Sequence, residues 1–184
     1  MSARILRQRE LIEDDWTIAE DARPASAETA GGKRIVTLER WRSARQALLA
    51  AHAAVGVLVP NTADIESIYP EIGDRPLIAL QFPTFSDGRA LSQAVLLRKR
   101  LGFKGELRAV GDVIRDLVFW LGRCGFDSIV PRQDQSLEAC RQALDELTVA
   151  YQAAADDHAP VWVRRRRRGT DQNPLSGNAV NTSL

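Results

Sequence analysis

Hydroxyl, carboxylate and guanidinium groups crowd into one short segment of this sequence, LQFPTFSDGRALS at residues 80–92. Its polar side chains stand within six residues of one another: Thr84, Ser86, Asp87 and Arg89. Such groups could bind an anion and move a proton, with the carboxylate as donor or acceptor. They could equally form a turn with a helix cap, because Ser and Asp are preferred immediately before a helix.

Similar polar groups occur before and after this segment, each following a short apolar run. The candidate catalytic residues are Asp87 and Asp112, and the candidate ligand-binding residues are Asn61, Thr84, Ser86, Gly88, Arg89, Arg108, Gly111, Arg115 and Arg132. Asp112 has a second interpretation as a helix cap, and it could also pair with Arg115 three residues on. Arg108 falls inside an apolar run, so it reaches either the end of a strand or the core.

These residues need a scaffold in which strands and helices alternate. The apolar patterns predict helices at 39–52, 63–69, 90–101, 112–123 and 136–155, and strands at 34–38, 55–59, 77–80, 107–110 and 128–130. Continuous apolar strands between helices predict a parallel sheet in an α/β fold. The successive strand-helix units suit an open doubly wound sheet or half of an eight-stranded barrel. Both architectures place a ligand site at the carboxyl ends of the strands.

The N-terminal region reads as a short-stranded arm. Short, mainly apolar stretches at 5–6, 11–12 and 16–18 predict short strands, and residues 21–33 read as a flexible connection. A half-barrel has two open edges, so it predicts either a homodimer or edges covered by these N-terminal strands. We therefore expect one α/β domain over 1–160, with an arm and linker at 1–33 and a core at 34–160, followed by a disordered Arg-rich tail at 161–184.

Two strand-helix units share a pattern at an offset of 23 residues. The offset places Gly88 on Gly111, and Gly102-Phe103 on Gly125-Phe126. In the second pair a glycine follows the last helical turn and an aromatic follows the glycine. This pattern predicts a left-handed helix C-cap whose next side chain folds back on the helix.

Composition narrows the function classes. Two cysteines and two histidines in 184 residues offer no metal-ligand or iron-sulfur spacing, so we expect no intrinsic metal or iron-sulfur site and leave the cofactor open. Cys124 and Cys140 read as small buried hydrophobes. The five consecutive arginines lie in the tail and the body carries excess negative charge, which argues against nucleic acid as a partner. Without a span of about 20 apolar residues or a signal peptide, we expect a cytoplasmic protein with no membrane partner.

Several stretches resemble an uncharacterised bacterial family, catalogued as domain of unknown function 934. They are residues 58–61, 78–89, 102–113 and 123–128. Members of that family tend to be encoded beside assimilatory sulfite reductase and other sulfate-assimilation genes, and are often labelled probable oxidoreductases. The resemblance therefore implies a pathway, but it brings no established catalytic residue.

Two hypotheses follow for the function. In the first, the chain is an enzyme or catalytic accessory of sulfite reduction that binds a small or phosphorylated anion through Arg89 and Arg108, with Asp87 or Asp112 in proton transfer. In the second, it is a non-catalytic partner of sulfite reductase, or of the electron donor of that enzyme, and supports assembly or electron delivery.

Overall fold

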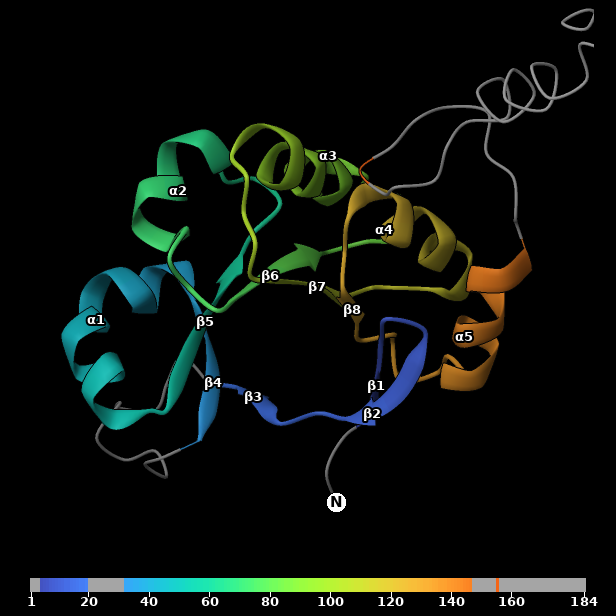
Figure 1. Ribbon diagram of the computed structural model, residues 1–184, viewed down its shortest axis with the longest axis horizontal. Coiled ribbons are helices and arrows are strands. Elements are labelled where there is room, and N and C mark those ends of the chain that lie inside the picture. Colours follow the sequence, from blue (N-terminus) through green and yellow to red (C-terminus); the bar gives the residue numbers. More distant parts are fainter. Residues whose placement is uncertain (1–3, 20–31, 147–154, 156–184) are drawn as a thin grey trace, which may run out of the picture.

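The computed structural model describes residues 4–19, 32–146 and 155, which form a single curved sheet with helices outside it (Figure 1). The sheet has eight strands in the order β2-β1-β8-β7-β6-β5-β4-β3. Its parallel centre consists of β4 (Lys33–Thr37), β5 (Ala54–Val59), β6 (Leu77–Phe82), β7 (Glu106–Gly111) and β8 (Ser128–Ile129). The predicted parallel α/β fold is confirmed, in its half-barrel form.

The helices follow the strands and lie along the outer face of the sheet (Figure 1). They are α1 (Leu38–Ala51), α2 (Ile65–Ile72), α3 (Arg89–Val95) with its π-helical continuation η2 (Leu96–Arg100), the 3-10 turn η3 (Arg115–Leu117) leading into α4 (Val118–Cys124), and α5 (Leu137–Glu146). Residues 147–154 of the predicted helix, residues 21–31 of the predicted linker and the tail lie outside the described residues. The last residue of the predicted linker, Lys33, instead begins β4. Within the described part of the chain, the helices are too short or too polar to span a bilayer.

The N-terminal strands cover both edges of the sheet, as one of the two sequence alternatives predicted. The hairpin of β1 (Arg4–Arg7) and β2 (Glu10–Glu13) pairs antiparallel with β8, and β3 (Trp16–Ile18) pairs parallel with β4. Because Asp14 and Asp15 alone separate β2 from β3, the sheet must curve until its opposite edges approach each other. A homodimer stays a prediction.

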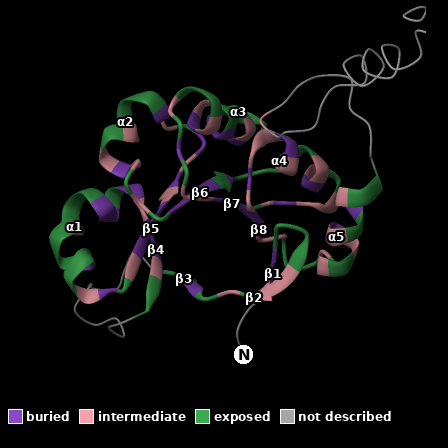
Figure 2. Ribbon diagram, in the orientation of Figure 1, coloured by how far each residue is buried: buried purple, intermediate pink, exposed green. Residues whose placement is uncertain are grey.

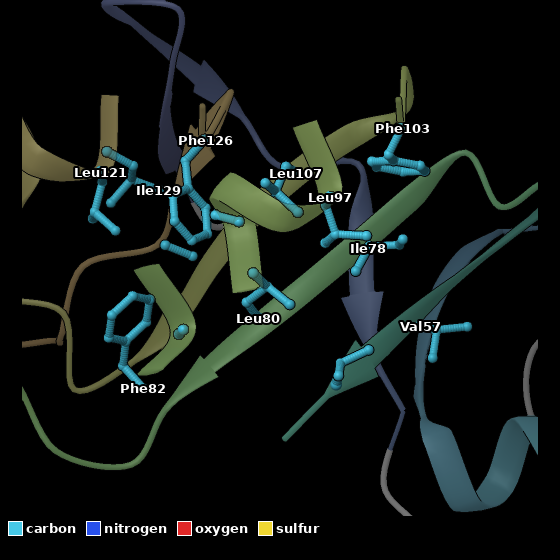
Figure 3. Packing of buried hydrophobic residues seen from close by; sticks show 14 of the residues in the cluster. Val57, Ile78, Leu80, Phe82, Leu97, Phe103, Leu107, Leu121, Phe126 and Ile129 are labelled. Atoms are coloured by element: carbon cyan, nitrogen blue, oxygen red, sulfur yellow. The ribbon is translucent and has the colours of Figure 1, made fainter. Parts of the chain in front are cut away.

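Alternate strand residues face two different apolar cores. Val57, Ile78, Leu80 and Leu107 lie in the larger core beneath the helices, each with no exposed surface (Figure 3). A smaller cluster of Trp16, Ile35, Leu77, Ala79 and Val110 occupies the inner face of the curved sheet. Figure 2 shows the resulting pattern, with buried strands beneath helices whose outer surfaces are exposed. Burying one such side chain contributes roughly 1.5–3 kcal/mol. Both faces of the central strands β4 to β7 carry residues packed in these clusters, so both faces contribute to the stability of the fold.

The predicted helix C-caps are confirmed in both repeat units. Gly102 and Gly125 have φ values of +70° and +96°. The amide of Phe103 donates to Leu97 O at 2.9 Å, and that of Phe126 donates to Leu121 O at 3.1 Å. The repeated Gly-Phe pattern therefore ends both helices at a left-handed glycine, although the closing bond spans six residues after the π-helical η2 and five after α4.

Candidate functional site

Hydrogen bonds connect the loops that follow β5, β6, β7 and β8, in series. Asn61 Nδ2 donates to Asp87 Oδ2 at 2.7 Å. In the same loop as Asp87, the Phe85 amide donates to Asp112 Oδ2 at 2.9 Å, and Arg132 Nη1 donates to Asp112 Oδ1 at 2.6 Å. We call Asn61, Phe85, Asp87, Asp112 and Arg132 the strand-end belt. The structure thus gathers candidates from all four loops at the carboxyl end of the sheet.

Asp87 is both a helix cap and an ion-pair partner. Its Oδ1 accepts the backbone N–H of Arg89 at 3.2 Å, and Arg89 Nη2 donates to its Oδ2 at 2.6 Å. Gly88 occupies the formal cap position without a side-chain bond. Hydrogen bonds from Arg89, supported by Asn61, hold the pKa of the Asp87 carboxyl well below its ordinary value. Asp87 is therefore a carboxylate throughout the physiological pH range.

Asp112 does not cap a helix, so that interpretation was wrong. The next helical turn begins only at Arg115, whose N–H donates to Gln135 Oε1 at 3.0 Å. Asp112 instead joins the loop after β6 to Arg132, and its carboxylate is 22% exposed. Its role in the structure is to brace two neighbouring loops.

Gly111 places Asp112 over the end of β6. Its φ is +103°, and a Cβ at this position would lie 2.3 Å from Phe82 O. The turn lets the Asp112 amide donate to the same Phe82 oxygen at 2.8 Å. Gly88 has φ −78° and nothing closer than Leu91 Cδ1 at 3.9 Å, so the glycines that the repeat equates have different functions in the backbone.

Arg132 is held between two carboxylates. Nε donates to Asp134 Oδ1 at 2.7 Å, in addition to the bond from Nη1 to Asp112. Hydrogen bonds to Asp134, and then to Asp112, raise the pKa of Arg132 above its ordinary value. Its charge is therefore permanent and largely neutralised.

The rim of the belt is exposed and includes an aromatic side chain that the sequence interpretation did not single out. Phe85 is 52% exposed although its amide is fixed by Asp112. The hydroxyls of Thr84 and Ser86 lie on either side of it in the chain, 3.4 Å apart. The sequence signal that could have identified Phe85 is its place as a hydrophobic residue inside a polar loop.

Gln93 is a second residue that sequence reasoning missed. Its side chain is buried and its Nε2 donates to Pro60 O at 3.1 Å and Ala63 O at 2.9 Å. It therefore anchors the loop that carries Asn61 to α3. The only sequence signal for this buried position of Gln93 is its place in the helix between Ala90 and Ala94, both of which are buried.

Two predicted arginines lie away from the belt. Arg108 points to the inner face of the sheet, where its Nη1 donates to Asp14 and its Nη2 to Glu106, and it is 1% exposed. Arg115 forms ion pairs with Asp116, at 3.6 Å, and with Glu146. A role for either in ligand binding stays a prediction, but each guanidinium already has carboxylate partners.

The charges at this end of the sheet nearly balance. Two guanidiniums, of Arg89 and Arg132, face three carboxylates, of Asp87, Asp112 and Asp134.

No group of three or more His, Cys, Asp or Glu side chains suited to a metal ion occurs among residues 4–19 and 32–146. Cys140 is buried in the core, as predicted, and burial raises the pKa of its thiol; Cys124 is partly buried against the same core. The belt itself offers hydrogen-bonding side chains and the exposed ring of Phe85.

Comparison with known proteins gives one match. Residues 56–162 fit the model of a family described as "Bacterial protein of unknown function (DUF934)". Neither a curated protein nor a solved structure is similar enough to be matched. The matched region begins in β5, extends past α5 and contains every residue of the strand-end belt. Because it covers more than half of the chain, this protein belongs to the DUF934 family.

Proposed function

We propose that this protein is an accessory factor of assimilatory sulfite reduction, and that it acts through the strand-end belt by binding rather than by catalysis. The pathway comes from the association of the family with sulfite reductase genes. The mode of action comes from the geometry of the belt.

The observation that carries the proposal is the pairing of the candidate acids. A general acid or base works best when its pKa lies near the operating pH. Arg89 holds the pKa of Asp87 well below that range, and Asp112 is bonded to Arg132 and to the Phe85 amide. Both candidate catalytic residues are thus better suited to fixing loops than to moving protons.

A fixed loop that exposes an aromatic side chain favours a protein partner. Interface hot spots are enriched in aromatic residues surrounded by polar groups that exclude water. Phe85 has this setting, because its amide is bonded to Asp112, its ring is exposed and the polar residues Thr84 and Ser86 are its neighbours in the chain. Preorganisation of the loop lowers the entropy lost on binding. We propose sulfite reductase or its electron donor as the partner.

A small or phosphorylated anion is the second candidate ligand, and one observation favours it. Arg89 is 58% exposed, and within the described residues its Nη1 has no carboxylate partner. This free edge can donate to sulfite or to a phosphate group. Because Asp87 neutralises the other edge, we expect weak binding.

Deletion of the gene tests the pathway. We expect the deletion strain to grow normally on sulfide and poorly on sulfate and sulfite. Normal growth on all three sulfur sources would refute a role in sulfite reduction. A defect on sulfate alone would place the protein before sulfite.

Binding experiments then separate the two ligands. Calorimetry with sulfite, sulfate and adenosine phosphosulfates measures anion binding, and co-purification from cells grown on sulfate measures docking to the reductase. We expect co-purification, and we expect Phe85→Ala to abolish it. The matched control is Leu49→Ala, which removes a hydrophobic side chain of similar exposure, 43%, from α1. Heat of binding with an anion but no co-purification would favour the second candidate.

A further inference from the structure

One extended segment, residues 10–18, joins the two edges of the half-barrel. It contains β2, which pairs with β1 at one edge, and β3, which pairs with β4 at the other. Asp14 and Asp15 connect the two strands across the open side of the sheet. We refer to residues 10–18 as the strap.

Asp14 attaches the strap to the inner face of the sheet. Its carboxylate oxygens accept hydrogen bonds of 2.8 and 2.9 Å from Arg108 Nη1. The two side chains are 12% and 2% exposed, so water competes little for this charge-assisted contact.

Arg108 has further partners on the sheet itself. Nη2 donates to Glu106 Oε1 at 2.8 Å, and Nε donates to Ser128 Oγ at 3.1 Å. Arg108 would therefore stay paired if Asp14 moved away. Arg108 thus differs from a member of an isolated buried ion pair, whose charge is left buried without a partner when the other member is lost.

The strand pairings that join the strap to the central sheet are short. β3 pairs with β4 over three residues, and β2 reaches the sheet only through β1, which pairs with β8 at Leu6–Ile129 and Arg7–Ser128. In contrast, β6 and β7 pair along their whole length, from Leu77–Glu106 to Phe82–Gly111. Short ladders at the edge of a sheet open at a lower free energy than long central ones.

From these contacts we propose that the strap opens as a unit while the central sheet stays folded, and that the Asp14–Arg108 contact is the latch that holds it closed. Opening removes Trp16 from the inner cluster and uncovers Ile35, Leu77 and Ala79. It also frees the edge of β4, to which another extended chain can pair. The strap thus controls access to the interior of the half-barrel, independently of the strand-end belt.

Native-state hydrogen exchange of the full chain tests this proposal. The amides of Ala19, bonded to Ile35 O at 2.8 Å, and of Gln8, bonded to Asp127 O at 3.0 Å, report on the strap and its hairpin. The amides of β5 and β6 report on the central sheet. In the unmodified protein we expect the first group to exchange through openings of lower free energy and weaker denaturant dependence than the second.

Asp14→Asn tests the latch, with Asp15→Asn as the matched control. Asp15 is the neighbouring acid and pairs with Lys33 at the surface. Asn keeps one accepting oxygen, so Asp14→Asn removes the negative charge and one of the two hydrogen bonds from Arg108 Nη1. Loss of a hydrogen bond between charged groups should speed exchange in the strap about tenfold or more, whereas loss of the exposed ion pair of Asp15 should change it at most about fivefold. Exchange in β5 and β6 should stay the same in both variants.

Three results would overturn the proposal: equal opening free energies for the strap and β6 in the unmodified protein, equal effects of the two substitutions, or a uniform loss of protection in Asp14→Asn. The comparison of opening free energies between the strap and β6 needs no variant. It therefore tests the proposal even if Asp14→Asn fails to fold.

Discussion

Replacement of Gly111 by Ala should destabilise the fold far more than the same change at Gly88. At Gly111 the new Cβ would lie 2.3 Å from Phe82 O, in a backbone with φ +103°. The positive φ costs an alanine about 1–3 kcal/mol, and displacement of the packed β6 and β7 backbones costs about 1–3 kcal/mol more. The expected loss of unfolding free energy is therefore about 2–6 kcal/mol, a large part of the 5–15 kcal/mol typical of a domain.

Gly88→Ala is the matched control. Its φ is −78° and the nearest atom to a new Cβ is Leu91 Cδ1 at 3.9 Å, so we expect a change within about 1 kcal/mol. Urea denaturation followed by circular dichroism measures both variants, and an unchanged slope with denaturant shows that only stability differs. The reasoning would be refuted if Gly111→Ala lost less than about 1 kcal/mol, or if both alanines cost the same.

Two further predictions concern Asp87 and Cys140. Because the pKa of Asp87 is lowered in the folded chain, its ionised form stabilises the fold above the unfolded pKa of about 4, and this stabilisation is lost as the pH falls below it. The stability difference between the unmodified protein and Asp87→Asn should therefore shrink on acidification, as measured by urea denaturation from pH 7 to pH 3; a constant difference would contradict the pairing with Arg89. Cys140 is fully buried, so a serine hydroxyl at this position would have no partner in the core. Cys140→Ser should therefore lower the free energy of unfolding by about 1–3 kcal/mol more than Cys140→Ala does. Thermal unfolding compares the two variants, and equal melting temperatures would show that the hydroxyl finds a partner.

Local patterns were sufficient to predict the elements and the end of the sheet at which the candidates gather. Apolar runs and helical spacing depend on neighbouring residues, and parallel strands bring their carboxyl ends to one edge. Asn61, Asp87, Asp112 and Arg132 were therefore expected near each other before their contacts were known. The Gly-Phe pattern likewise predicted two C-caps, because the left-handed residue and the following contact are adjacent in the chain.

Contacts between distant residues could not be predicted in this way. The partner of Asp112 is an amide 27 residues away, and that of Arg108 is an acid 94 residues away. Such pairs depend on the order of the strands and on the curvature of the sheet, which local spacing does not contain. The same limit explains why the internal repeat equated Gly88 with Gly111, although only Gly111 meets the neighbouring strand.

Complementation of the deletion strain tests the central claim, that the protein serves sulfite reduction through its strand-end belt. We predict that the unmodified gene and Leu49→Ala restore growth on sulfite, that Phe85→Ala does not, and that sulfide supports all strains equally. Immunoblots of each variant ensure that the proteins are present at the same level. Full growth of the Phe85→Ala strain on sulfite would contradict the claim that this exposed ring is the working surface of the protein.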